Sequence, residues 1–164
     1  FSVGESELQG LGAKELSGNY SAWSYFQSID TAVNRKFVQA FKSRYGEGRV
    51  IGDPMEATHA GIHLWASAVE NSGSLELERV KPALSGRNST AARGAVRVDG
   101  KNQHLWQVAR IGRLQGNGQF DIVWESGILP PVNFPASRER YEWQELLDGL
   151  YREWGGNWAS PNSD

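Results

Sequence analysis

The sequence predicts an α/β fold in which helices come first and a β-meander follows. In the first half, apolar residues recur at helical spacing between segments rich in glycine and proline. After Gly86 the pattern changes to an alternation of apolar and polar residues, which is typical of half-buried strands. The 164 residues contain no internal repeat, and they suffice for one sizeable core or two small ones.

The chain before the first long helix is expected to be mostly irregular. Residues 4–18 are rich in glycine and polar residues, which favours a loop with one helical turn. Residues 19–27, NYSAWSYFQ, are rich in aromatic residues and lie between turn residues, which predicts a strand.

The first long helix is marked at both ends. Asp30 or Thr31 can cap its start, and Gly46 and Gly48 end it. Its apolar residues fall on one stripe at helical spacing: Val33, Phe37, Val38, Phe41 and Tyr45.

A second long helix is predicted from Asp53 to Gly73. Asp53 is expected to cap it, because Pro54 then occupies the first helical position and Glu56 the third. Its expected apolar face comprises Ile62, Trp65, Ala66 and Val69. A shorter helical segment opens at Ser74 and contains Pro82, which must kink or interrupt it.

Three strands and a helical tail follow. Residues 94–100, 104–114 and 119–126 alternate, and the turn 115–118 joins the last two strands as a hairpin. Residues 129–135, LPPVNFP, suit an extended linker. The tail then forms a helix that ends at Gly155 and Gly156. One continuous face of this helix is apolar: Trp143, Leu146, Leu147, Leu150, Tyr151 and Trp154. We therefore divide the chain into a domain over 1–131 and a linker with a tryptophan-rich helix over 132–164.

The composition excludes several classes of function. Seventeen basic and nineteen acidic residues give a net charge of −2, which argues against a nucleic-acid surface. The chain has no apolar run of the roughly 20 residues that a membrane span needs. It has no cysteine and therefore no disulfide or thiol chemistry. It starts at Phe1 without an initiator methionine, and we expect it to be a piece of a longer chain.

Catalytic and metal-binding patterns are sparse. His59 and His63 share a helix face and follow Glu56, but their order differs from the metalloprotease motif and no third ligand is evident. We expect surface or partly buried histidines there, no metal and no cofactor. No serine lies in a G-x-S-x-G motif, and Asp30 and Asp53 already serve as helix caps. Seven tryptophans could stack on sugars, but packing is their more common use. The residues alone indicate a domain that is not an enzyme.

Several motifs resemble one family in order and spacing. The segments FSVGESEL, SAWSYFQSIDTAVNRKFVQAFKSRYG, DPMEATHAGIHLWASAVENSGS and ARGAVRVDGKNQHLWQVARIGRLQGNGQFDIVW carry the resemblance, which covers residues 1–131. They closely resemble the C-terminal half of urea- and short-amide-binding proteins. Those proteins have the type I periplasmic binding fold, as do amide-sensing regulators and branched-chain amino-acid receptors.

The resemblance implies a fold of two lobes that close around a small ligand, with the N-terminal half outside this chain. It implies that Ser2, Val3 and Glu5 belong to a loop facing the cleft, although an exposed loop explains them equally well. It also places Tyr25 and Phe26 beside a hinge. Phe26 then forms a wall of the ligand site or packs between the lobes, and packing is favoured for Tyr25 because neighbouring strand residues face opposite sides.

The resemblance implies a periplasmic binding component for urea, a short amide or a similar small solute. Its partners would be the membrane subunits of an ABC transporter. Two alternatives remain: a sensory domain of the same fold coupled to a signalling output domain, and a hydrolase that the missing half completes. The isolated chain is expected to pair with that N-terminal half, or to self-associate through exposed apolar helix faces.

Overall fold

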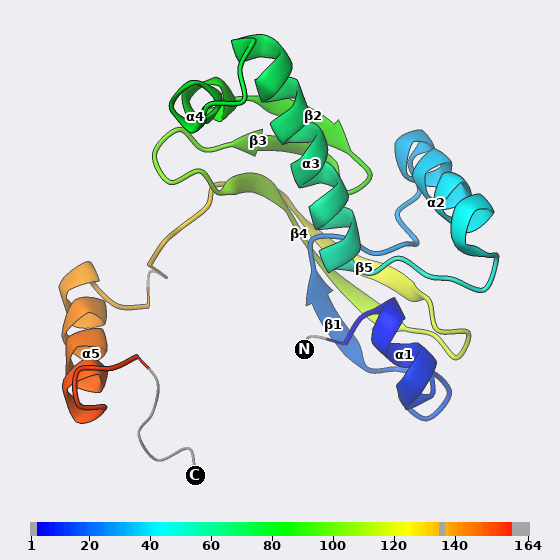
Figure 1. Ribbon diagram of the computed structural model, residues 1–164. Helices are drawn as coiled ribbons and strands as arrows, with labels where there is room; N and C mark the ends of the chain where they lie inside the picture. The colour runs from blue at the N-terminus through cyan, green and yellow to red at the C-terminus, as the bar shows by residue number, and fades with distance from the viewer. Residues whose placement is uncertain (1–2, 135–136, 159–164) are drawn as a thin grey trace. The chain divides into compact units, whose positions relative to one another are not determined.

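The computed structural model of the chain describes residues 3–134 and 137–158. The chain divides into two compact units, Phe1–Pro131 and Val132–Asp164. The first unit contains four helices and five strands within the described residues, and the second contains one helix, α5 (Arg140–Glu153). Figure 1 shows the order of these elements along the chain.

The sheet of the first unit is built around β4 (Leu105–Leu114). It pairs antiparallel with β5 (Phe120–Leu129) along one edge, through the hairpin that the sequence predicts. On its other edge it pairs with β1 (Tyr20–Trp23) and with β3 (Gly94–Val98), which in turn pairs with β2 (Asn88–Ala91). Strand β2 was not predicted, because Asn-Ser-Thr-Ala has no apolar alternation.

The predicted strand over 19–27 is shorter than expected. Strand β1 ends at Trp23, and the chain then bends, so Tyr25 and Phe26 lie in the connection to the next helix. The irregular segment before it contains a helix of two turns, α1 (Glu5–Leu11), instead of one turn. The Glu7 carboxylate accepts a hydrogen bond from the backbone N–H of Gly4 at 2.8 Å, which stabilises its start.

Helix α2 (Ala32–Tyr45) has the predicted ends. The Thr31 side chain accepts a hydrogen bond from the backbone N–H of Asn34, and Gly46 closes the helix. The centre of its apolar stripe is partly buried against Tyr25, Ile29 and Ile51, whereas Val33 and Tyr45 are exposed.

In helix α3 (Asp53–Ser72), Asp53 is the first helical residue, whereas the prediction placed it at the cap with Pro54 first. Gly52 occupies the capping position, and the Asp53 side chain makes no cap hydrogen bond. The expected cap is therefore wrong, because the Asp53 carboxylate instead accepts the backbone N–H of Tyr25 at 2.7 Å. Gly73 ends the helix in the left-handed conformation, as predicted.

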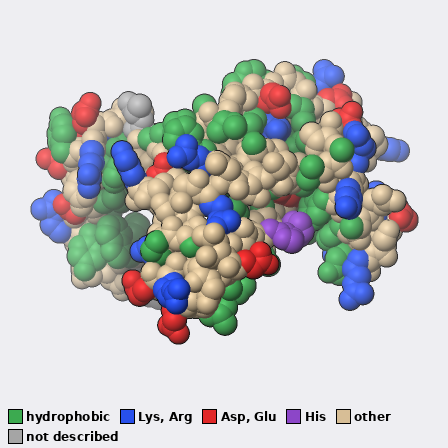
Figure 2. All heavy atoms as spheres, turned by 90° about the horizontal axis from the view of Figure 1, so that it is seen from above, with side chains coloured by type: hydrophobic (Ala, Val, Ile, Leu, Met, Phe, Trp, Pro, Cys, Tyr) green, Lys and Arg blue, Asp and Glu red, His purple; other side chains and the backbone are tan. Residues whose placement is uncertain are grey.

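The apolar face expected on α3 is partly exposed, in line with the expectation of exposed apolar helix faces. The buried residues of α3 are Glu56, Ala60, Leu64 and Ala68, whereas Ile62 and Trp65 are exposed. Leu64 packs on Val96 and Val98, so α3 lies over β3 (Figure 1). Helix α4 (Leu77–Leu84) packs beside α3 and contains Pro82. Figure 2 shows hydrophobic side chains that reach the surface on one face of the molecule.

Candidate ligand-binding site

The connection between β1 and α2, residues 24–31, is held by two carboxylates from different helices. Asp53 at the start of α3 accepts the backbone N–H of Tyr25. Glu5 at the start of α1 accepts the backbone N–H of Gln27 through Oε1, also at 2.7 Å. These two hydrogen bonds fix the loop against both helices.

Tyr25 anchors the same loop to α2. Its side chain is fully buried, and its hydroxyl donates to Oδ1 of Asn34 at 2.9 Å. The Asn34 amide group donates in turn to the carbonyl oxygens of Gln27 and Ile29, at 2.9 and 2.7 Å. Burial raises the pKa of Tyr25, and the nearby Glu5 carboxylate raises it further. Tyr25 therefore holds the loop in place as a neutral hydrogen-bond donor.

Phe26 points to the other side of the loop, into a separate cluster. Its ring packs against Phe120 with the centroids 4.9 Å apart, and Leu8 and Leu114 complete the cluster. A Cβ on Gly112 would lie 2.8 Å from Cζ of Phe26, so glycine is required beneath the ring. Phe26 has no exposed surface. Phe26 is therefore packed inside this unit, and both packing between the lobes and contact with a ligand remain predictions.

Glu5 is the most unusual residue of the junction. It is 2 % exposed, and Oε2 is the one buried side-chain nitrogen or oxygen atom without a hydrogen-bond partner among the described residues. Burial raises the pKa of Glu5 to about 7, and the neighbouring carboxylates of Glu7 and Asp53 add to this effect. Leaving such an acceptor unpaired is costly, and the usual explanation is a functional role or a missing donor.

Of the two remaining predicted residues, Val3 lies next to this cluster. The carbonyl of Val3 accepts hydrogen bonds from the Ser21 hydroxyl at 2.6 Å and the Trp23 indole at 3.3 Å. Val3 also lines a pocket of about 430 Å³ together with Leu16, Leu114 and others. Ser2 lies outside the described residues. The structure thus brings Glu5, Tyr25 and Phe26 to one loop, with Val3 at its margin.

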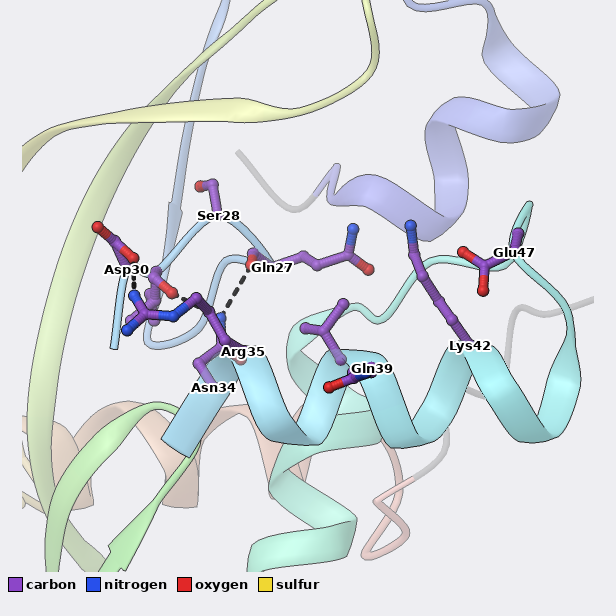
Figure 3. A pocket seen from close by; sticks show the side chains of 10 residues that line it. Gln27, Ser28, Asp30, Asn34, Arg35, Gln39, Lys42 and Glu47 are labelled. Carbon is purple, nitrogen blue, oxygen red and sulfur yellow. Dashed lines mark hydrogen bonds and ion pairs between the residues drawn. The ribbon is translucent and has the colours of Figure 1, made fainter. Parts of the chain in front are cut away.

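A polar pocket of about 470 Å³ opens beside the loop, over α2 (Figure 3). Its lining includes two cations and two anions, Arg35, Lys42, Asp30 and Glu47, of which Arg35 and Asp30 form an ion pair. Gln27 lies in this lining, and its Oε1 accepts the backbone N–H of Ile51 at 2.9 Å. Charges of both signs in equal number suit a small polar solute without net charge.

Arg93 is a structural contributor to the junction that sequence reasoning missed. Its guanidinium forms a buried ion pair with Glu56, donates to the carbonyl of Asp53 at 3.2 Å and donates to Gln107 at 2.8 Å. These contacts tie the start of α3 to the β2–β3 turn and to β4. An arginine after a short polar strand has the pattern of a surface residue, so the sequence carried no signal for this role.

An α/β domain with buried carboxylates around a loop and a polar pocket beside it is suited to binding a small molecule. The profile of the periplasmic binding protein domain family matches residues 1–140. The chain belongs to this family, and its α/β fold is that of the type I periplasmic binding proteins.

Three similar proteins illustrate the relationship. A protein named limonene hydroxylase from Geobacillus stearothermophilus is 38% identical over 150 residues, which cover 87% of this chain and 27% of that protein. The Leu/Ile/Val-binding protein homolog 6 of Brucella abortus is 28% identical over 63% of this chain and 26% of its own length. A solved ABC transporter substrate-binding protein from Sphaerobacter thermophilus superposes with a TM-score of 0.68 at 24% identity, over 79% of this chain and 36% of that chain.

The chain thus spans about a quarter to a third of the length of these relatives. Two of the three are named as binding proteins and one as an enzyme. Within residues 3–134 and 137–158, no group of three or more histidine, aspartate and glutamate side chains is placed to hold a metal. No helix among those residues is long and apolar enough to cross a membrane.

Proposed function

We propose that the chain is part of the solute-binding component of an ABC transporter, that it acts in the periplasm, and that it catalyses no reaction. The family match over residues 1–140 supports the binding role. We further propose urea or a short amide as the ligand. The motifs YFQSID and DPMEA support this choice, because they resemble those of urea- and amide-binding proteins.

The observation that carries the ligand proposal is the unpaired oxygen of Glu5. A buried acceptor needs a donor, and urea and primary amides present N–H groups that can donate to Oε2. A carboxylate ligand would instead be repelled by the Asp53 carboxylate, whose charge already raises the pKa of Glu5. A free amino acid carries both an ammonium donor and a carboxylate, so it satisfies Oε2 at the cost of that repulsion.

Access to Glu5 requires motion, since only 2 % of the residue is exposed. The resemblance implies a fold that opens and closes about a hinge, and the loop beside Glu5 lies at that hinge. Val3 is proposed to line the closed site together with Glu5. Phe26 is proposed to support the wall from behind, through its contact with Phe120.

Titration calorimetry tests the proposal on this chain completed by the N-terminal half that the resemblance implies. Urea and acetamide are expected to bind, and leucine is expected to bind at least about tenfold more weakly. Glu5→Gln should weaken urea binding by about tenfold or more, because the amide nitrogen replaces the acceptor Oε2. Glu15→Gln makes the same change at an exposed position and should leave binding unaltered.

Two outcomes would contradict different parts of the proposal. If leucine binds more tightly than both amides, the assignment to urea or amides is wrong while the binding role stands. If none of these solutes binds and the chain hydrolyses urea or acetamide, the binding role itself is wrong. A sensory domain of the same fold would use the same site. Unlike a transport component, it would not bind the membrane subunits of a transporter.

A further inference from the structure

Two histidines on α3 face each other at the surface, away from the junction described above. His59 and His63 are one helical turn apart, and both are exposed. Their Nε2 atoms lie 3.2 Å apart, and the rings meet edge to face at 63° with centroids 4.5 Å apart. Figure 2 shows histidine side chains on the surface that it draws.

This separation matches the spacing of two nitrogens bound to one metal ion. Imidazole nitrogens bind zinc at about 2.0–2.1 Å, so two of them lie about 3.0 Å apart at a right angle and about 3.4 Å apart at the tetrahedral angle. The observed 3.2 Å falls between these values. The separation therefore allows one ion to contact both Nε2 atoms.

The surroundings favour the form of histidine that binds metals. The Phe37 ring of α2 packs against His59 with the centroids 4.5 Å apart, which restricts the rotation of the imidazole. Partial burial lowers the pKa of His59, and the neighbouring His63 lowers it further, while Glu56 opposes them. Only a neutral imidazole coordinates a metal, and the lowered pKa favours that form of His59.

We propose that His59 and His63 form a two-ligand site for a divalent late first-row transition metal ion, with water in the remaining positions. Imidazole suits Cu²⁺, Ni²⁺ and Zn²⁺, whereas Mg²⁺ and Ca²⁺ prefer oxygen ligands. Two protein ligands on an exposed face hold an ion exchangeably, unlike the closed four-ligand structural sites. This exchangeable site departs from the expectation, drawn from the sequence, that His59 and His63 hold no metal.

The same distance also suits a hydrogen bond between two neutral rings. In that arrangement one Nε2 carries a proton and donates to the other, and an entering ion displaces that proton to the opposite ring nitrogen. The hydrogen bond alone predicts no preference for transition metals, so metal titration separates the two explanations.

The test titrates this chain with CuCl₂, NiCl₂, ZnSO₄ and MgCl₂ in a non-coordinating buffer, followed by calorimetry. We expect one ion per chain, with Cu²⁺ bound most tightly and Mg²⁺ not bound, in the order that imidazole sites follow. His59→Gln and His63→Gln should each weaken Ni²⁺ binding by about tenfold or more. His104→Gln removes the third histidine, which lies exposed in the β3–β4 connection, and should leave binding unchanged.

The three replaced histidines are exposed, so circular dichroism should show the same helix content in all three variants. Absence of Ni²⁺ and Cu²⁺ binding at millimolar ion would overturn the proposal. Equal loss of affinity in His104→Gln and His63→Gln, or binding that survives both replacements on α3, would assign the metal to another part of the chain and overturn it as well.

Discussion

The Glu56 carboxylate accepts hydrogen bonds from both the backbone N–H and the side-chain Nε of Arg93. Glu56 is fully buried and Arg93 is 4% exposed, so the pair is shielded from water on both sides. Arg93 also donates to the Asp53 carbonyl, and the Asp53 carboxylate holds Tyr25. A continuous set of polar contacts therefore links β4, the β2–β3 turn and α3 to the loop that carries the candidate site.

Arg93→Met should destabilise the fold strongly, because it leaves the Glu56 charge buried without a partner. Such replacements cost about 3–5 kcal/mol. The double variant Arg93→Met with Glu56→Leu should recover part of that loss, since the buried charge is then removed as well. Urea denaturation measures the free energy of unfolding of both variants.

Arg113→Met is the control. It breaks the exposed pair with Asp121 and should cost less than about 1 kcal/mol. Equal losses for Arg93→Met and Arg113→Met would contradict this account of the junction.

Gly112→Ala should also destabilise the chain, through the packing of Phe26. The added methyl group would lie 2.8 Å from Cζ of Phe26 and 2.9 Å from Cβ of Phe120, which is closer than van der Waals contact. Overpacking of this kind costs about 1–3 kcal/mol. Gly127→Ala, on the neighbouring strand β5, meets no atom within 4 Å and serves as the control. Thermal unfolding followed by circular dichroism compares the two, and equal melting temperatures would show that Phe26 can move.

Phe26→Ala distinguishes packing from ligand contact. Removing a fully buried phenylalanine from a core typically costs about 3–5 kcal/mol. Because Phe26 has no exposed surface, we expect a lower melting temperature without ligand. An unchanged melting temperature together with roughly 10- to 100-fold weaker binding would instead favour direct contact with the ligand.

Elements with local signals were predictable from the sequence. The side-chain oxygen of Thr31 marks the start of α2, and Gly46, which has no Cβ, marks its end. The β4–β5 hairpin follows from alternation on both sides of a glycine-rich turn. Asp53 shows where local rules fail. It has the sequence context of a helix cap, but two long-range partners, Tyr25 and Arg93, decide the position of its carboxylate.

The candidate site was predictable only in part, for a related reason. Glu5 and Phe26 were identified through a family resemblance, and their burial depends on residues more than 20 positions away in the chain. No local pattern reveals that Glu5 Oε2 lacks a donor or that Arg93 is buried. Ile62 and Trp65 are exposed, as the expectation of an exposed apolar face requires. Helical spacing did not identify the opposite, buried face of α3, which contains Ala60, Leu64 and Ala68, because both faces carry apolar residues.

Glu5 should make the stability of the chain depend on pH. Burial raises its pKa from 4.5 to about 7, so the folded chain binds this proton more tightly than the unfolded chain. The contribution to the free energy of unfolding is fully present below about pH 4.5 and is lost as the pH rises through about 7. Its size is on the order of 3 kcal/mol. Glu5→Gln should abolish this loss, whereas Glu15→Gln should retain it. Parallel curves of stability against pH for the wild type and Glu5→Gln would contradict the raised pKa.

The exposed apolar side chains of α2 and α3 should drive association of the isolated chain. Val33, Ile62 and Trp65 are 44%, 59% and 48% exposed. Groups of exposed apolar side chains commonly mark interaction surfaces. We therefore expect light scattering to report a mass above that of the 18.2 kDa monomer.

Charge placed on that surface should reverse the association without unfolding the chain. Ile62→Lys combined with Trp65→Lys adds two cations to exposed positions of α3, where they stay hydrated and repel a second copy. Leu75→Lys makes the same kind of change at an apolar residue outside α2 and α3, 74% exposed, and should leave the assembly intact. The comparison is made at equal protein concentration, because association depends on it. A wild-type chain that remains a monodisperse monomer of 18.2 kDa at high concentration would show that these side chains are tolerated in water.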